Sequence, residues 1–246
     1  MKYLSLLLIA FSLSCQTQQQ KHILIYTKNG EGFVHDNIEA SVNALKKLAA
    51  ENNYTTEATA DPTFFTPENL AKFDCIIFSN TNNEAFDNQA QRDAFQQYVQ
   101  SGGGFVGIHS ASGSERDWPW FWAMVGGKFV RHPELQSFEM KVLDQQNPAT
   151  NFLGETWLWE DEVYYLDNLN PDIHVLLAAD LRTVEDDSKD DFHRNRFGNY
   201  TPLAWVHQFD GGKQFFTALG HKSEYYSDPV FLKHLLGGIQ WVLQED

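Results

Sequence analysis

Residues 87–108, DNQAQRDAFQQYVQSGGGFVGI, hold the pattern that decides the fold. Within residues 87–100, Phe95 and Val99 lie on one face of an otherwise polar segment, which predicts an amphipathic helix. Three glycines follow, and residues 105–108 then form a short apolar run that is typical of a buried strand. A helix that leads through a turn into a buried strand belongs to a strand-helix-strand unit, so this stretch predicts a parallel sheet.

The same alternation continues toward the amino terminus, where strands are expected at residues 22–27, 54–59 and 73–79 and a helix at 36–52. After about residue 135 the pattern changes to strands with more alternation, followed by one last helix. These are expected at residues 138–143, 162–166, 173–179, 203–209 and 214–219, with the helix at 229–243. We therefore predict an α/β fold, in which a parallel sheet is flanked by helices and carries a strand-rich C-terminal extension. Neither a repeat nor a linker interrupts residues 22–246, which are expected to form one domain.

The composition limits the partners. The chain has 246 residues, of which 42% are apolar, so a sizeable core is expected. Its 33 acidic and 18 basic residues give a formal charge of −15. We do not expect the protein to bind nucleic acid, because contacts to phosphates need clustered Lys and Arg. We find no nucleotide or flavin motif, which leaves the cofactor open. Residues 180–201 are polar and rich in both charges, and they predict a long surface loop.

The amino terminus predicts export. Met1 and Lys2 precede an apolar run of 11 residues at positions 3–13, which is too short to span a bilayer but suits a secretory signal. Ser14 and Cys15 end this run, as in a bacterial lipoprotein signal. We expect residues 1–14 to be removed, Cys15 to carry the lipid that anchors the protein to a membrane, and residues 15–21 to form a polar tether. The alternative is an ordinary cleaved signal peptide.

Motifs along nearly the whole chain carry a resemblance to known proteins. Residues 102–111, GGGFVGIHSA, resemble the strand-to-helix elbow of class I glutamine amidotransferases, with His109 in the place of the nucleophilic Cys. More specifically, the chain resembles the ThuA-like family, named for trehalose utilisation. The matching motifs are GFVH at 32–35, GIHS at 107–110, WPW at 118–120, GGKFVRHP at 126–133, EDEVY at 160–164, PLAW at 202–205 and LGH at 219–221. The resemblance implies a flavodoxin-like sheet and a role in sugar metabolism.

Four histidines stand at expected strand ends or in the loops that follow them: His35, His109, His132 and His221. Ligands collect at the carboxyl ends of strands in open parallel sheets, so we expect these side chains to share one crevice. Imidazole exchanges protons near neutral pH and also binds metals. His109 cannot replace a Cys nucleophile in acyl transfer, which argues against a glutaminase. The resemblance places His221 where amidotransferases carry their triad His, although Ser223 stands where their acid is expected.

Carboxylates and aromatic rings gather at residues 157–165. Glu160 and Glu162 are expected on one face of a strand and Asp161 on the other, beside Tyr164. Acids accept hydrogen bonds from sugar hydroxyls and aromatic rings cover the apolar faces of sugars, so a carbohydrate is the expected ligand. Trp118 belongs to a second aromatic segment.

Three functions remain open from the sequence. The first is an enzyme that acts on a carbohydrate or an oxidised sugar by acid–base chemistry. Its catalytic residues would be His109, His221 and Glu162, and its substrate-binding residues His35, His132, Asp161, Glu160, Trp118 and Tyr164. The second is a metal-dependent sugar enzyme in which His35, His109, His132 and His221 hold a divalent ion, although no compact metal motif is present. The third is a non-catalytic sugar-binding lipoprotein.

Overall fold

A nine-stranded sheet organises the chain in a computed structural model, which describes residues 20–188 and 198–244. The signal peptide expected at residues 1–14, Cys15 and most of the tether lie outside the described residues. The strand order is β2-β1-β3-β4-β11-β10-β9-β6-β7. No helix within the described ranges has the length and apolar character needed to cross a bilayer.

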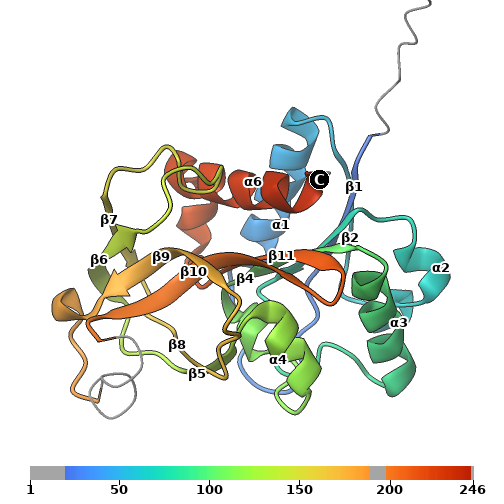
Figure 1. Cartoon of the computed structure of the whole chain (residues 1–246). Coiled ribbons are helices and arrows are strands. Elements are labelled where there is room, and N and C mark those ends of the chain that lie inside the picture. Colours follow the sequence, from blue (N-terminus) through green and yellow to red (C-terminus); the bar gives the residue numbers. More distant parts are fainter. Residues whose placement is uncertain (1–19, 189–197, 245–246) are drawn as a thin grey trace, which may run out of the picture.

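The first five strands of this order are parallel (Figure 1). They are β2 (Thr55–Thr59), β1 (His22–Tyr26), β3 (Cys75–Ser79), β4 (Gly104–Ile108) and β11 (Gly212–Thr217). Strands β3 and β4 are buried along their whole length, as their continuous apolar sequences predict. Cys75 is among these buried side chains. The predicted α/β fold with a parallel sheet is confirmed.

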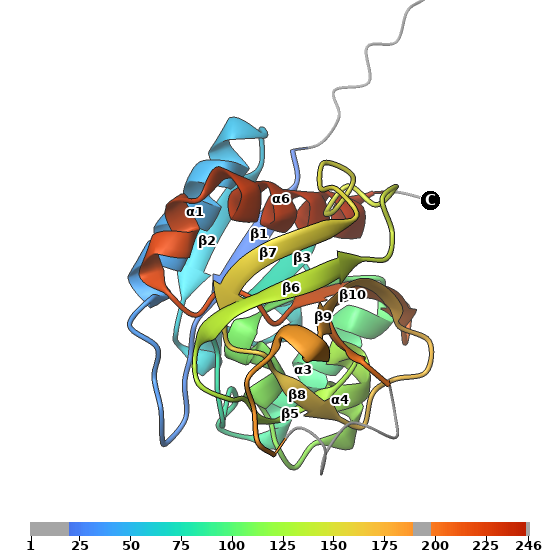
Figure 2. The same cartoon turned by 90° about the vertical axis from the view of Figure 1, so that its left-hand side faces the viewer.

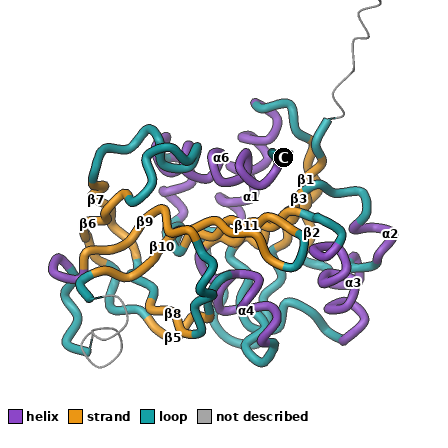
Figure 3. The backbone as a smooth tube through the Cα atoms, in the orientation of Figure 1, coloured by secondary structure: helices purple, strands orange, loops and turns teal. Residues whose placement is uncertain are grey.

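The other four strands are antiparallel to their neighbours and form the strand-rich extension. They are β10 (Tyr200–Phe209), β9 (His174–Asp180), β6 (Gln136–Val142) and β7 (Thr156–Asp161). A separate two-stranded sheet pairs β5 (Lys128–Arg131) with β8 (Tyr165–Asp167). Figure 3 shows that β10, β9, β6 and β7 extend the parallel sheet on one side.

Helices cover both faces of the sheet. Helices α1 (Ile38–Glu51) and α6 (Pro229–Leu243) lie on one face, and α3 (Gln89–Gln100) and α4 (Pro119–Val125) lie on the other (Figure 2). Shorter helices join the main elements. These are η1 (Pro62–Phe64), α2 (Pro67–Leu70), η2 (His109–Gly113), η3 (Leu181–Thr183) and η4 (Ser223–Ser227).

One prediction about the extension was wrong. A strand was expected over residues 162–166, but β7 ends at Asp161 and β8 starts at Tyr165. Residues 162–164 form the connection between them, so Glu160 and Glu162 do not share a strand face. The apolar and aromatic residues on both sides of this connection gave no signal for the break. The connection matters because it carries a side chain of the candidate site.

Candidate functional site

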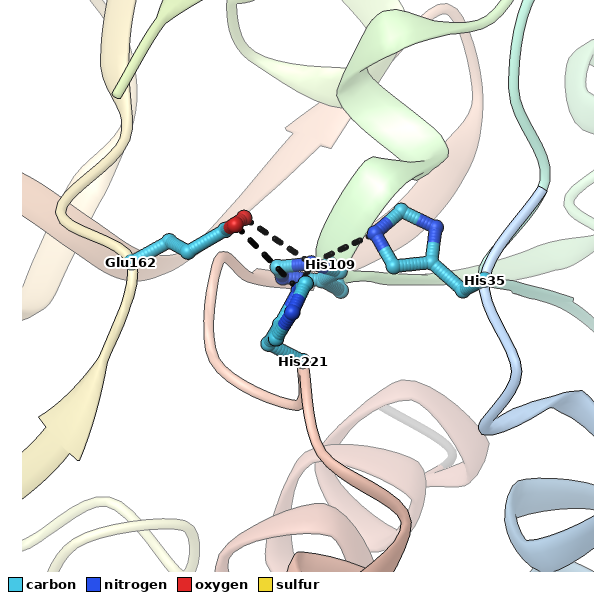
Figure 4. Close-up of side chains that lie close together, drawn as sticks. All are labelled: His35, His109, Glu162 and His221. Carbon is cyan, nitrogen blue, oxygen red and sulfur yellow. Dashed lines mark hydrogen bonds and ion pairs between the residues drawn. The ribbon is translucent and has the colours of Figure 1, made fainter. Parts of the chain in front are cut away.

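Four side chains from distant parts of the chain converge at one point (Figure 4). His35 follows β1, His109 follows β4 and His221 follows β11, so all three stand at carboxyl ends of parallel strands. Glu162 comes from the connection after β7. One ligand atom from each residue lies within 4.8 Å of the others. The topology therefore brings together the three histidines as expected, whereas their chemical roles stay predictions.

His109 is the centre of this cluster and is fully buried. Its φ of +53° is in the left-handed region, which costs a residue with a Cβ about 1–3 kcal/mol and is typical of functional turns. Its Nδ1 donates to the carbonyl of Ala218 at 2.7 Å, so Nε2 carries the lone pair of the neutral ring. That atom faces His35 Nε2 at 3.1 Å, His221 Nδ1 at 3.3 Å and the Tyr164 hydroxyl at 2.9 Å.

The backbone of His221 is held from two sides. The buried carboxylate of Asp161 accepts hydrogen bonds from the amides of Gly220 at 2.8 Å and His221 at 3.4 Å. On the other side, the Asn37 amide donates to the carbonyls of Gly220 and His221 at 2.7 and 2.8 Å. Gly220 itself has a φ of +123°, a conformation that favours glycine. These bonds fix the turn that aims His221 at His109.

Glu162 completes the cluster and links it to a fifth side chain. One carboxylate oxygen lies 3.4 Å from His221 Nδ1 and 3.5 Å from His132 Nδ1, and the other lies 3.5 Å from His109 Nε2. His132 Nδ1 also donates to the carbonyl of Pro133 at 2.8 Å. The side chain of His132 is 37% exposed, so this residue lies at the rim rather than in the cluster.

Burial keeps the inner histidines neutral. It lowers the pKa of His109 well below its usual value, an effect that neighbouring His35 strengthens. Burial likewise lowers the pKa of His35 to about 4, with His221 contributing. The Glu162 carboxylate, which accepts a hydrogen bond from the His221 ring, instead raises the pKa of His221. Two neutral imidazoles therefore direct their nitrogen atoms at the centre of the cluster at neutral pH, and neutral imidazole is the form that binds metals.

The spacing of the four ligand atoms suits a divalent ion. Metal–nitrogen bonds of about 2.0–2.1 Å in a tetrahedral site place neighbouring ligands about 3.3 Å apart. The distances from His109 to His35, His221 and Glu162 are 3.1, 3.3 and 3.5 Å, and the distance from His221 to Glu162 is 3.4 Å. Hydrogen bonding alone explains this crowding poorly, because the single lone pair of His109 Nε2 cannot serve all of its neighbours.

A cavity of about 270 Å³ opens beside the cluster. His35, Glu162, His132 and Tyr164 reach it from the site. The remaining lining combines aromatic and polar groups, namely Phe33, Asn82, Ser110, Gly113, Arg116 and Phe129. Such a mixture is typical of a small-molecule site.

Three residues expected to bind substrate lie elsewhere. Asp161 is completely buried, and its carboxylate is occupied by amides and by the Trp159 indole, so it positions the site and does not line the cavity. Burial raises its pKa to about 6. Glu160 pairs with Lys222 on the surface. Trp118 packs against Trp120 and lines a different cavity. Glu162 does not share the strand face of Glu160, as had been predicted, because β7 stops at Asp161.

Four residues that hold or line the site were not identified from the sequence. Asn37 holds the His221 turn through backbone carbonyls that are more than 180 positions away along the chain. Arg116 lies in the polar segment after the elbow, and the sequence offered no periodicity or motif to single it out. Phe33 and Phe129 were quoted only as parts of motifs, although their rings line the cavity.

Fold and site together define a class of protein: a mixed α/β protein in which the turn after a central parallel strand places a histidine in a buried cluster of His and Glu side chains. The chain belongs to the ThuA family, described as trehalose utilisation, whose family model matches residues 22–242. None of the curated proteins matches the sequence.

Solved structures share the fold over nearly the whole chain. A ThuA-like protein from Bacteroides uniformis ATCC 8492 has 23% identity and a TM-score of 0.73, covering 95% of this chain and 96% of that one. A ThuA-like protein from Parabacteroides merdae ATCC 43184 has 17% identity and a TM-score of 0.70, with coverage of 92% and 91%. Agd3, a carbohydrate deacetylase, has 12% identity and a TM-score of 0.57, covering 91% of this chain but 32% of its own. At these identities the likeness shows the fold alone.

Proposed function

We propose that this protein is an enzyme that acts on a carbohydrate with the help of a divalent metal ion held by His35, His109, Glu162 and His221. The observation that carries the proposal is the convergence of three imidazole nitrogens and one carboxylate within 4.8 Å. This donor set suits zinc and other first-row divalent ions. Of the three functions left open by the sequence, the geometry favours the metal-dependent one.

The position of His109 supports the metal over direct acid–base catalysis by this residue. A general base must reach the proton that it removes, through about 2.6–3.2 Å or one water. His109 is 0% exposed, and its two nitrogens face Ala218 on one side and the cluster on the other. His132 is better placed for proton transfer, because it lines the cavity and its Nδ1 bond to Pro133 leaves Nε2 for a ligand.

Carbohydrate is the substrate class that the cavity and the family support. The family description names trehalose utilisation. Rings of Phe33, Phe129 and Tyr164 line the cavity together with polar side chains, an arrangement that can cover the C–H face of a sugar and still bind its hydroxyls. A divalent ion would polarise a carbonyl or hydroxyl oxygen there. We further propose that the protein is exported and anchored through Cys15, where it would meet such sugars before uptake.

Metal stripping and reloading test this function. Purified protein would be treated with EDTA, reloaded with one equivalent of zinc, manganese or cobalt, and assayed against a panel of sugars and oxidised sugars. We expect about one ion per chain and turnover that is lost on stripping and restored on reloading. Turnover that survives stripping would instead support metal-free acid–base catalysis. Sugar binding without turnover in every metal form would support a binding protein.

A further inference from the structure

Arg116 brings a fixed positive charge to the cavity beside the cluster. Its Nε donates to Asn83 Oδ1 at 2.9 Å, and its Nη2 donates to Asn82 Oδ1 at 3.4 Å. The guanidinium carbon lies 5.7 Å from the centre of the Phe129 ring. The two amides and the ring hold a half-buried side chain that would otherwise sample many rotamers.

The charge of Arg116 has no carboxylate partner within residues 20–188 and 198–244 of the structure. Its two hydrogen-bond acceptors are neutral amides, and no ion pair joins it to an acid within 4.0 Å among those residues. The side chain also borders a second cavity, whose acids are Glu84, Glu115 and Asp117. Glu115 is paired with Arg92 at 2.6 Å, and neither Glu84 nor Asp117 forms an ion pair with Arg116 within the described residues. Arg116 is thus oriented by neutral groups while donors of its guanidinium remain for a ligand.

Two packed rings connect Arg116 with the cluster. Phe129, under the guanidinium, packs against Tyr164 with ring centres 4.5 Å apart. The Tyr164 hydroxyl then lies 2.9 Å from His109 Nε2. A ligand that covers these rings would meet the cluster at one end and the guanidinium at the other.

We infer that the substrate is a sugar acid whose carboxylate binds Arg116 while its hydroxyl or carbonyl oxygens face the His and Glu cluster. The planar guanidinium fork matches a carboxylate with two parallel hydrogen bonds. A phosphate group suits the cavity less, because Arg116 is the one Lys or Arg among the described residues that line it, and Glu162 adds a negative charge. This inference rests on the proposed function for the sugar and extends it to a charged substrate class.

Matched ligands test the inference on zinc-loaded protein. Glucuronate, its neutral amide and glucose 6-phosphate would be titrated calorimetrically into wild type, Arg116→Gln and Arg116→Lys, with zinc content measured on the same samples. Arg182→Gln is the control, because Arg182 is 61% exposed and pairs with Asp180 outside the cavity. We expect wild type and the control to bind glucuronate at least tenfold more tightly than the amide. Arg116→Gln should bind both equally, and Arg116→Lys should fall between.

The outcomes separate this inference from the proposed function. Equal binding of glucuronate and its amide by wild type, or a preference that survives in Arg116→Gln, overturns the role of Arg116 and leaves the metal site standing. Tighter binding of glucose 6-phosphate overturns the carboxylate assignment. Absence of sugar binding to zinc-loaded protein also overturns the inference. Failure to bind zinc refutes the proposed metal site, whereas an Arg116-dependent preference for glucuronate would still support the inference.

Discussion

Replacing His221 with alanine should weaken zinc binding by about 100- to 1,000-fold. The ligand atoms of His35, His221 and Glu162 lie 3.1–3.5 Å from His109 Nε2, so each of the four ligands should contribute a similar share of the binding free energy. Closed zinc sites bind with about 10–16 kcal/mol at neutral pH, which gives roughly 2.5–4 kcal/mol for each of four ligands. Each 1.4 kcal/mol corresponds to about a factor of ten in affinity.

His221 is the ligand whose loss should disturb folding least. Its side chain is 25% exposed, and its Nδ1 contacts are with His109 and Glu162. His109, by contrast, is fully buried and satisfies the Ala218 carbonyl. Removing His221 should therefore affect the metal and leave the sheet intact, as circular dichroism and thermal melting in EDTA would show.

Competition with a chromogenic chelator at pH 7.5 would measure the zinc affinities. His174→Ala is the control, because His174 lies on β9 with its side chain 62% exposed and pairs with Asp144 away from the cluster. The control should bind zinc like wild type. Zinc affinity of His221→Ala within threefold of wild type would refute its role as a ligand. If wild type shows no saturable zinc binding at micromolar concentrations, the metal site itself is wrong.

Four further predictions follow from the same structure. Asp161→Asn should weaken zinc binding about 10- to 100-fold by loosening the turn that aims His221, and an unchanged affinity in the same titration would exclude this positioning role. His109→Asn should abolish turnover while sugar binding weakens much less; wild-type turnover would reduce His109 to a structural residue. Burial lowers the pKa of His234 to about 4, so the folded state stays neutral while the unfolded state takes up a proton below about pH 6.5. Neutral His234 therefore stabilises the fold above pH 6.5, and about 2 kcal/mol of this stabilisation is lost between pH 7 and 5. Urea unfolding at several pH values should show that the free energy of unfolding of His234→Gln falls less steeply with decreasing pH than that of wild type, and an equal fall would contradict the prediction. Cys15→Ala should release the protein from the membrane fraction, and a variant that stays bound would contradict lipidation.

The sequence predicted the parallel half of the fold because burial on both faces leaves continuous apolar runs, as in β3 and β4. It also predicted that His35, His109 and His221 would meet, since each follows such a run and parallel strands end at one edge. His207 and His234 lie within apolar or amphipathic runs of the sequence, and both are buried with hydrogen bonds to backbone carbonyls. Local pattern was sufficient wherever the position of a side chain followed from its own strand.

Local pattern failed where a role depends on distant contacts. The sequence named Glu162 as the catalytic acid and placed Glu160 and Asp161 among the substrate-binding residues. It missed the end of β7 at Asp161, which is the last residue of β7 that pairs with β6. Asp161 then acts through the amides of Gly220 and His221, about 60 positions further on. The orientation of the Arg116 side chain is set by the amides of Asn82 and Asn83 and by the Phe129 ring. These residues come from separate segments, so no periodic pattern in the sequence connects them with Arg116.

Segments outside the parallel half complete the candidate site. The parallel half presents His109 in a left-handed turn at the end of β4, and it adds His35 and His221. Imidazole is a poor nucleophile for acyl transfer, and the parallel half brings three histidines but no carboxylate to the cluster. Glu162 comes from the connection between β7 and β8, and the walls formed by Phe129, His132 and Tyr164 come from β5 and the residues next to the β5–β8 sheet. A carboxylate among the imidazoles adds the negative charge that favours a divalent ion, and the walls make the cavity in which a ligand can reach it. The candidate site therefore forms where the parallel strands meet the segments that carry Glu162, Phe129, His132 and Tyr164.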